Sequence, residues 1–312
     1  MSLERTVYLN GQFVREAEAR LSIFDSALVW GDMVFETTRS FGHRPFKLRE
    51  HLERLRASMM AADIDVGMSV GHLEAVTVEL VRRNELLYPA DVDFTIVHNV
   101  SPGVWGWYAS ADQNAGRPTL AIHTWPLIPY IGPMAAGFSE GVRAYVPRQH
   151  AIPGRLLDPK IKSRSRMHYR LASNEAQRQG ADTWAVLIDD DGYLTEGTGS
   201  NFFMVRDGVL MTPEPRNILR GVTRQTIMDL AADLGMQVRE TNLEPYDAIV
   251  AGEAFFASTP FVIMPVTTFN DRPVGDGSVG TITRRLLDAF SETVGVDIAA
   301  QARAYAAQLK AS

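Results

Sequence analysis

Apolar and polar residues alternate near the start of the chain, which predicts β-structure. In TVYLNGQFV the pair Asn10-Gly11 lies between two alternating runs, a pattern typical of a tight β-hairpin. The pattern of residues 28–40 is also typical of β-structure and predicts a pair of strands. The spacing then becomes helical before it returns to that of strands, which predicts helices over about 50–62 and 70–84 and strands over 91–100 and 119–127.

The second half shows the same patterns after a break in periodicity. Residues 125–138 hold three prolines and two glycines and predict a linker. Predicted strands then cover about 141–147, 183–189, 201–206 and 209–212, and predicted helices about 166–179, 222–235, 280–293 and 297–310. Because strands and helices do not alternate regularly, we expect an α+β fold with one domain over 1–124 and a second over 139–312.

The composition narrows the class of protein. The 312 residues are 46% hydrophobic and carry a net charge of -6, which fits a globular protein and argues against a nucleic-acid partner. No apolar run reaches the roughly eighteen residues of a membrane span, and the N-terminus lacks the apolar run of a signal peptide. We therefore expect a cytoplasmic protein. The absence of cysteine excludes disulfides and thiolate chemistry, and no metal site is expected.

Primary amines are rare in this chain. Among 31 lysines and arginines, the only lysines are Lys47, Lys160, Lys162 and Lys310. Lys162 ends a short apolar segment before a predicted helix, where neighbouring arginines could keep its amine neutral and reactive, as a Schiff base requires. Lys160 is a rival, because residues two apart face the same side of a strand. Taken alone, this segment more often forms a solvated basic turn.

Glu196 stands in LTEGTGSN, followed by glycines and hydroxyl residues. Such residues let the backbone approach a ligand closely and offer several hydrogen-bond donors. A carboxylate there can keep a pyridine nitrogen protonated, which an electron-sink cofactor requires. A surface glutamate on a hairpin is the commoner reading of this segment alone.

Three further segments can bind an anion. They are the start of a predicted helix after Gly221, an arginine on the helix REHLERL, and the hydroxyls of AFFASTPFVIMPV. N–H groups at a helix start favour phosphate, arginine binds it through two N–H groups, and buried hydroxyls need partners. Each segment is also common in proteins that bind no phosphate. The candidate residues are Arg54, Val222, Thr223, Ser258 and Thr259.

In this order, the segments resemble the class IV aminotransferases, the pyridoxal-phosphate (PLP) fold-type IV family. The family includes branched-chain and D-amino-acid aminotransferases, (R)-selective amine transaminases and aminodeoxychorismate lyase. The resemblance runs from about Leu9 to Phe290, and LTEGTGSN, RDGVLMTP and ILRGVTR are its most specific parts. It implies a two-domain α+β fold like that of D-amino-acid aminotransferase, a PLP cofactor and a homodimer.

The resemblance assigns roles by position. Lys162 matches the Schiff-base lysine, because its distance to Glu175 fits the D-amino-acid and amine-transaminase pattern better than that of Lys160, and the C-terminal domain would carry it. Glu196 matches the partner of the pyridine nitrogen, and Leu219 the residue packed against the ring. Arg54, Val222, Thr223, Ser258 and Thr259 would hold the phosphate. The residues expected at the substrate are Phe35, Thr37, Arg39 and Trp105.

The substrate side departs from every subgroup. Branched-chain enzymes carry a tyrosine five residues after the lysine, but here Met167 stands there and Tyr169 lies two residues further on; Arg166 could replace it. The carboxylate-binding pairs of the subgroups are also missing, at Gly103 and Trp105 and near Asp93 and Thr95. Arg39, Arg148 or Arg155 could meet a carboxylate instead. The donor therefore stays open among hydrophobic or branched-chain amino acids, D-amino acids and (R)-amines.

The resemblance implies ping-pong transamination between an amino donor and a 2-oxo acid. The freed lysine amine would move a proton at the substrate α-carbon. A PLP lyase of the aminodeoxychorismate lyase type is the alternative, because it would share all the cofactor residues. A binding module that kept the fold without the cofactor is a third reading, which the presence of Lys162, Glu196 and Arg54 disfavours.

Overall fold

A computed structural model describes residues 4–111 and 116–311. The chain forms two compact units, each described here by itself. Unit 1 comprises Met1–Leu127 together with Ile161–Ser165, and unit 2 comprises Ile128–Lys160 together with Arg166–Ser312.

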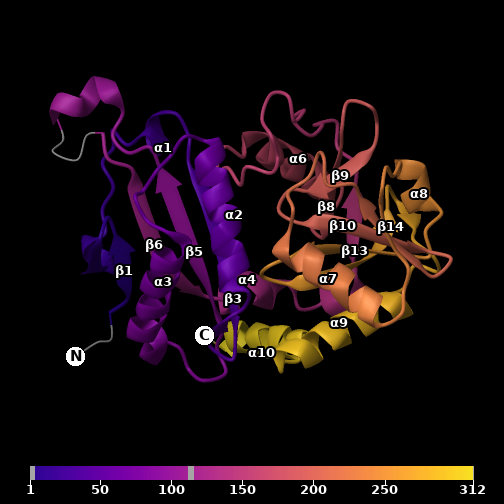
Figure 1. The fold of residues 1–312 in the computed structure, drawn as a ribbon. Coiled ribbons are helices and arrows are strands. Elements are labelled where there is room, and N and C mark those ends of the chain that lie inside the picture. The colour runs from indigo at the N-terminus through magenta and orange to yellow at the C-terminus, as the bar shows by residue number, and fades with distance from the viewer. Residues whose placement is uncertain (1–3, 112–115, 312) are drawn as a thin grey trace. The chain divides into compact units, whose positions relative to one another are not determined.

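Unit 1 is built on an antiparallel sheet covered by two helices. Its strand order is β2 (Gln12–Arg15), β1 (Thr6–Leu9), β6 (Thr119–Pro126), β5 (Phe94–Ser101), β3 (Val34–Phe41) and β4 (Arg44–Pro45). Helices α2 (Leu48–Ala61) and α3 (Val70–Asn84) lie side by side against this sheet (Figure 1). Their apolar positions recur at helical spacing, and the side chains of Leu52, Leu55 and Leu73 are fully buried.

Strand β3 presents two chemically different faces, because successive side chains point to opposite sides of a strand. Glu36 points toward α2, where it contacts His51 and Arg54. Phe35 and Thr37 therefore lie on the opposite face of the sheet.

The segment Ile161–Ser165 pairs with the start of β3. The amide of Phe35 donates to the carbonyl of Lys162 over 2.9 Å, and the amide of Arg164 donates to the carbonyl of Met33 over 2.7 Å. These bonds place Lys162 in unit 1, whereas the sequence predicts the lysine in the domain over 139–312. The difference arises because a β-bridge joins Val34 and Ser163, which are far apart in the sequence.

Unit 2 contains a mixed sheet that closes on itself. Its order is β12 (Val238–Thr241), β11 (Val209–Pro213), β10 (Asn201–Arg206), β13 (Glu253–Ser258), β14 (Val262–Phe269), β7 (Val142–Tyr145), β8 (Thr183–Ile188) and β9 (Leu194–Gly197), with β15 (Arg272–Pro273) beside β14. Because β9 also pairs with β10, the strands from β10 to β9 form a closed ring. Paired phenylalanines such as Phe203 and Phe255, both fully buried, form part of its core.

Helices and short turns surround this sheet. The longer helices are α6 (Met167–Gln177), α7 (Val222–Asp233), α9 (Thr281–Val294) and α10 (Ile298–Ala311), and α8 (Pro245–Ile249) is a short one (Figure 1). From Ile128 onward, the linker expected over 125–138 instead forms α4 (Ile128–Ile131), η4 (Gly132–Met134) and the start of α5 (Gly137–Glu140). The first two pack against α10, which explains why a segment without periodicity is ordered.

Most predicted elements are confirmed, and one is wrong. The strand pair expected over 28–40 is correct only from Val34 onward, because Ser26–Val29 forms the short helix α1. Asp25 caps this helix by accepting from the amide of Ala27, a signal that the apolar pattern hides. Among the described residues, no helix combines the length and the apolar character needed to cross a membrane.

Candidate active site

Lys162 lies beside β3 with its backbone fixed on both sides. Its carbonyl accepts from the amide of Phe35, and its amide donates to the hydroxyl of Ser58 in α2 over 3.1 Å. The Nζ atom lies 4.9 Å from the centre of the Phe35 ring. The rival Lys160 is engaged elsewhere, since its Nζ donates to the carbonyl of Arg216 and pairs with Asp158. The geometry thus favours Lys162 as the reactive amine.

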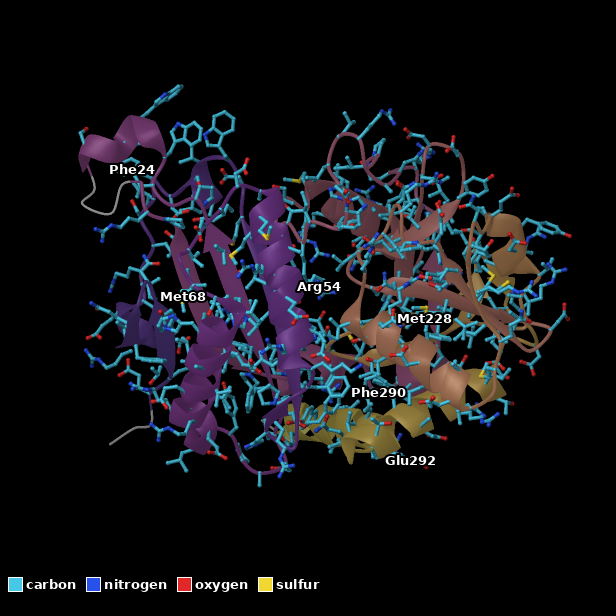
Figure 2. The ribbon with its side chains drawn as sticks, viewed as in Figure 1. Phe24, Arg54, Met68, Met228, Phe290 and Glu292 are labelled. Carbon is cyan, nitrogen blue, oxygen red and sulfur yellow. The ribbon has the colours of Figure 1, made fainter. Side chains whose placement is uncertain are left out.

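Arg54 projects from α2 and is held by a buried carboxylate (Figure 2). Its Nε and Nη2 atoms donate to the two oxygens of Glu36 over 2.8 and 2.7 Å. His51 contacts the same carboxylate at 3.0 Å. Burial alone would raise the pKa of Glu36, but Arg54 and His51 outweigh it and hold that pKa well below its usual range. Burial lowers the pKa of His51, so the imidazole stays neutral and Arg54 supplies the cation.

Glu196 is a buried carboxylate with three hydrogen-bond donors from three segments of unit 2. The hydroxyl of Tyr169 donates to its Oε1 over 2.9 Å. The amide of Leu219 and the side chain of Asn201 donate to its Oε2 over 2.9 and 3.3 Å. Hydrogen bonds to the charged form of a carboxylate favour that form, so this arrangement suits a permanent negative charge.

Tyr169 is a site residue that the sequence patterns did not identify. Burial, together with the charge of Glu196, holds the pKa of Tyr169 well above its ordinary value, so the hydroxyl stays a donor. Arg166 lies with its guanidinium 5.0 Å from the Tyr169 ring and donates to the carbonyl of Thr198. The only sequence signal was the displacement of this tyrosine from the family position, where Met167 is 73% exposed.

The expected phosphate residues of unit 2 lie at the start of α7 and at the end of β13. Gly221 precedes α7 without any side-chain cap, so the first amides of the helix can serve an anion. A Cβ atom on Gly221 would meet Asn201 Oδ1 at 2.2 Å, which explains the glycine. The hydroxyl of Ser258 is buried and has no hydrogen-bond partner among the described residues, and Thr259 follows it.

The expected substrate residues are all in unit 1. Phe35, Thr37 and Arg39 share one face of β3. Arg39 is only 1% exposed, with its guanidinium 4.3 Å from the centre of the Phe41 ring. Trp105 is half-buried, and its Nε1 atom is buried without a partner among the described residues.

A comparison with known protein families identifies the chain. The family model described as amino-transferase class IV matches residues 33–269. The chain belongs to the class IV aminotransferases. This aminotransferase is 35% identical over 287 residues to the putative branched-chain-amino-acid aminotransferase of Methanocaldococcus jannaschii, covering 92% of this chain and 95% of that protein.

Solved structures show the same likeness. The Escherichia coli branched-chain amino acid aminotransferase superposes on this aminotransferase with a TM-score of 0.84 at 29% identity, over 93% of this chain and 94% of that one. The branched-chain enzyme of Thermobaculum terrenum, solved in its PLP form, gives a TM-score of 0.81 at 26% identity over 98% of each chain. The predicted family, fold type, enzyme class and cofactor are confirmed: the chain is a PLP-dependent aminotransferase of fold type IV.

The residues of this aminotransferase fit PLP. The unpartnered buried hydroxyl of Ser258 and the uncapped start of α7 suit a phosphate. Glu196, fixed by three donors, suits a protonated pyridine nitrogen. In unit 1, Lys162 has its backbone fixed by Ser58 and its Nζ beside the Phe35 ring, and its primary amine is of the kind that binds the aldehyde of PLP.

Proposed function

We propose that this aminotransferase moves the amino group of a branched-chain amino acid to a 2-oxo acid by a ping-pong mechanism. The support for the donor class is the likeness to enzymes named branched-chain aminotransferases in sequence and in structure. The observation that carries the chemistry is the three-donor arrangement around buried Glu196.

Each residue of the site has a defined task in this proposal. Lys162 attaches the cofactor and, once released by the donor, its Nζ atom carries the proton taken from the substrate α-carbon. PLP, when bound, supplies an electron sink for that carbon. Glu196 supplies the negative charge opposite the pyridine nitrogen. Arg54, with Val222, Thr223, Ser258 and Thr259, holds the phosphate.

The donor half-reaction tests the proposal. Enzyme loaded with PLP is mixed with leucine and no acceptor, and the 2-oxo acid formed is counted. We expect one equivalent per subunit, because the amino group stays on the enzyme until an acceptor arrives. Lys162→Ala is expected to slow this reaction by roughly 10²–10⁴-fold, the range for loss of a catalytic acid–base. Lys160→Ala serves as the matched control and should keep the wild-type rate.

The alternatives give different results in the same assay. A lyase of the aminodeoxychorismate lyase type would form no 2-oxo acid from leucine, which has no group to eliminate, but would release pyruvate repeatedly from aminodeoxychorismate without an acceptor. A D-amino-acid or amine enzyme would react with D-alanine, D-glutamate or (R)-1-phenylethylamine but not with leucine. Retained activity in Lys162→Ala would contradict the assignment of the lysine.

We also propose that the enzyme is a homodimer. An apolar surface patch of unit 1, formed by residues 21–30 and 104–108, supports this. Its exposed side chains are large, since Ile23, Leu28, Trp30 and Trp107 are 72%, 65%, 61% and 83% exposed. Phe24 marks this region in Figure 2 and stacks on Tyr108. Contiguous apolar surface of this kind is typical of protein–protein interfaces.

A further inference from the structure

Arg164 shares its immediate surroundings with Lys162. The two residues are two positions apart in the segment that pairs with β3, and both side chains lie beside the ring of Phe35. The guanidinium carbon of Arg164 lies 3.7 Å from the centre of the Phe35 ring, and Lys162 Nζ lies 4.9 Å from the same centre. The two cations therefore flank one aromatic side chain.

The position of Arg164 is fixed by several contacts within unit 1. Its amide donates to the carbonyl of Met33 over 2.7 Å. Its Nε and Nη2 atoms donate to the side-chain oxygen of Asn99 over 3.2 and 3.0 Å. Asn99 stands opposite Phe35 in the β3–β5 register, so the sheet itself positions the partner. Although the residue is exposed, its guanidinium is pre-organised, which lowers the cost of binding a ligand.

We propose that Arg164 binds the α-carboxylate of the amino-acid substrate. This rests on the proposed function, in which the substrate amine replaces the amine of Lys162. The α-carboxylate is attached to the carbon that bears this amine, so it lies within a few bond lengths of the position of Lys162 Nζ. A guanidinium carries five N–H donors in a plane and matches a carboxylate with two parallel hydrogen bonds.

Two of the other arginines considered for this task, Arg39 and Arg155, have different surroundings. Arg39 is buried at 1% exposure against Phe41. Arg155 belongs to unit 2, where its exposed guanidinium faces Asp190 at 3.4 Å. Arg164, by contrast, packs on the same ring as the reactive lysine. In this proposal Arg164 takes the task of the carboxylate-binding side chains that are missing at Gly103 and Trp105, where the D-amino-acid enzymes carry them, and near Asp93 and Thr95, where the branched-chain enzymes do.

Ligand binding to the PLP-loaded enzyme tests the proposal without turnover. The probes are 4-methylpentanoate, which has the carbon skeleton of leucine without the amine, and its neutral amide. We expect the wild type to prefer the acid. Arg164→Gln should weaken acid binding about 10–100-fold, the range for a hydrogen-bonded charge, and leave amide binding unchanged. The affinity of Arg164→Lys for the acid should lie between those of the wild type and Arg164→Gln, because a lysine keeps the charge but lacks the planar guanidinium.

Arg49→Gln is the matched control, since Arg49 is an exposed arginine of unit 1 that pairs with Glu74 on the helices. It should bind both probes like the wild type. The proposal is overturned if the wild type binds acid and amide equally, if Arg164→Gln keeps the preference for the acid, or if Arg49→Gln loses it too. Melting temperature and cofactor absorbance of each variant show whether the fold and PLP binding persist. A wrong proposed function would be recognised in a different experiment, because the wild type would then fail in the donor half-reaction.

Discussion

Tyr169 occupies the third residue of α6 and directs its hydroxyl to Oε1 of Glu196. Removing that hydroxyl leaves a buried carboxylate oxygen without one of its donors. Hydrogen bonds to charged groups contribute roughly 1.5–3 kcal/mol, which corresponds to about 10–100-fold in an equilibrium or a rate. We therefore expect Tyr169→Phe to weaken PLP binding or slow the donor half-reaction by about that factor. Fluorescence titration of the apoenzyme with PLP and stopped-flow mixing with leucine measure the two effects.

Tyr145→Phe is the control for this variant. Tyr145 packs against the same buried hydrophobic cluster as Tyr169, so both changes remove a tyrosine hydroxyl beside that cluster. Of these two tyrosines, Tyr169 is the one whose hydroxyl donates to Glu196. Equal effects of the two substitutions on PLP affinity and rate would show that packing, and not the hydrogen bond, matters.

At the level of single residues, the sequence could indicate which side chains carry chemistry but not what holds them. Lys162 and Glu196 were identified because short motifs surround them. Their partners are distant in the chain: Ser58 contacts Lys162 across 104 positions, and the backbone amide of Leu219 contacts Glu196 across 23. A backbone donor leaves no signal in the residue type. The sequence therefore predicts for Leu219 only a packing contact of its side chain with the cofactor ring.

At the level of elements, the hydrophobic periodicity predicts a helix correctly where one face of that helix is buried. Helices α2, α3 and α7 begin and end within two residues of their predicted bounds. It failed for α4, η4 and α5, because each is too short to display a 3.6-residue repeat. Short helices of this kind are fixed by tertiary contacts, which local pattern does not encode.

A contact between α3 and the sheet makes the stability of the fold depend on pH. His98 on β5 is fully buried, and its Nε2 lies 2.9 Å from Thr77 Oγ1. Because Thr77 gives its own proton to the carbonyl of Leu73, Nε2–H must be the donor. The Nδ1 atom is buried without a partner among the described residues, so a second proton would be unsatisfied. Burial thus lowers the pKa of His98 to about 4.

This lowered pKa predicts acid sensitivity of the fold. The unfolded histidine takes up a proton near pH 6.5 and the native one only near pH 4, so native stability is full above pH 6.5 and declines as the pH falls toward 4. Between pH 7 and pH 5, protonation of the unfolded histidine lowers the free energy of unfolding by about 2 kcal/mol. Urea unfolding of wild type and His98→Gln at the two pH values should reveal that difference. His72→Gln, at an exposed position of α3, should keep the wild-type pH dependence.

At the scale of the whole molecule, composition and element order were enough to predict the fold class, which the structural likeness confirms. They could not predict that the chain returns to unit 1 at Ile161–Ser165. That return depends on a few backbone bonds to β3. This return of the chain matters for the chemistry, because it places Lys162 and Arg164 on the ring of Phe35.

The apolar patch of unit 1 makes a prediction about assembly. Burial of a large aliphatic side chain contributes roughly 1.5–3 kcal/mol, so a charge in its place should weaken a dimer strongly. We expect wild-type enzyme to sediment with twice the 34.6 kDa mass of the chain, and Leu28→Glu to shift the equilibrium toward monomer at micromolar concentration. Leu86→Glu is the matched control, because Leu86 is 80% exposed but lies outside the patch. A monomeric wild type, or equal dissociation of both variants, would show that this patch is not the interface. Parallel loss of donor half-reaction rate in Leu28→Glu alone would further show that activity depends on the assembled dimer.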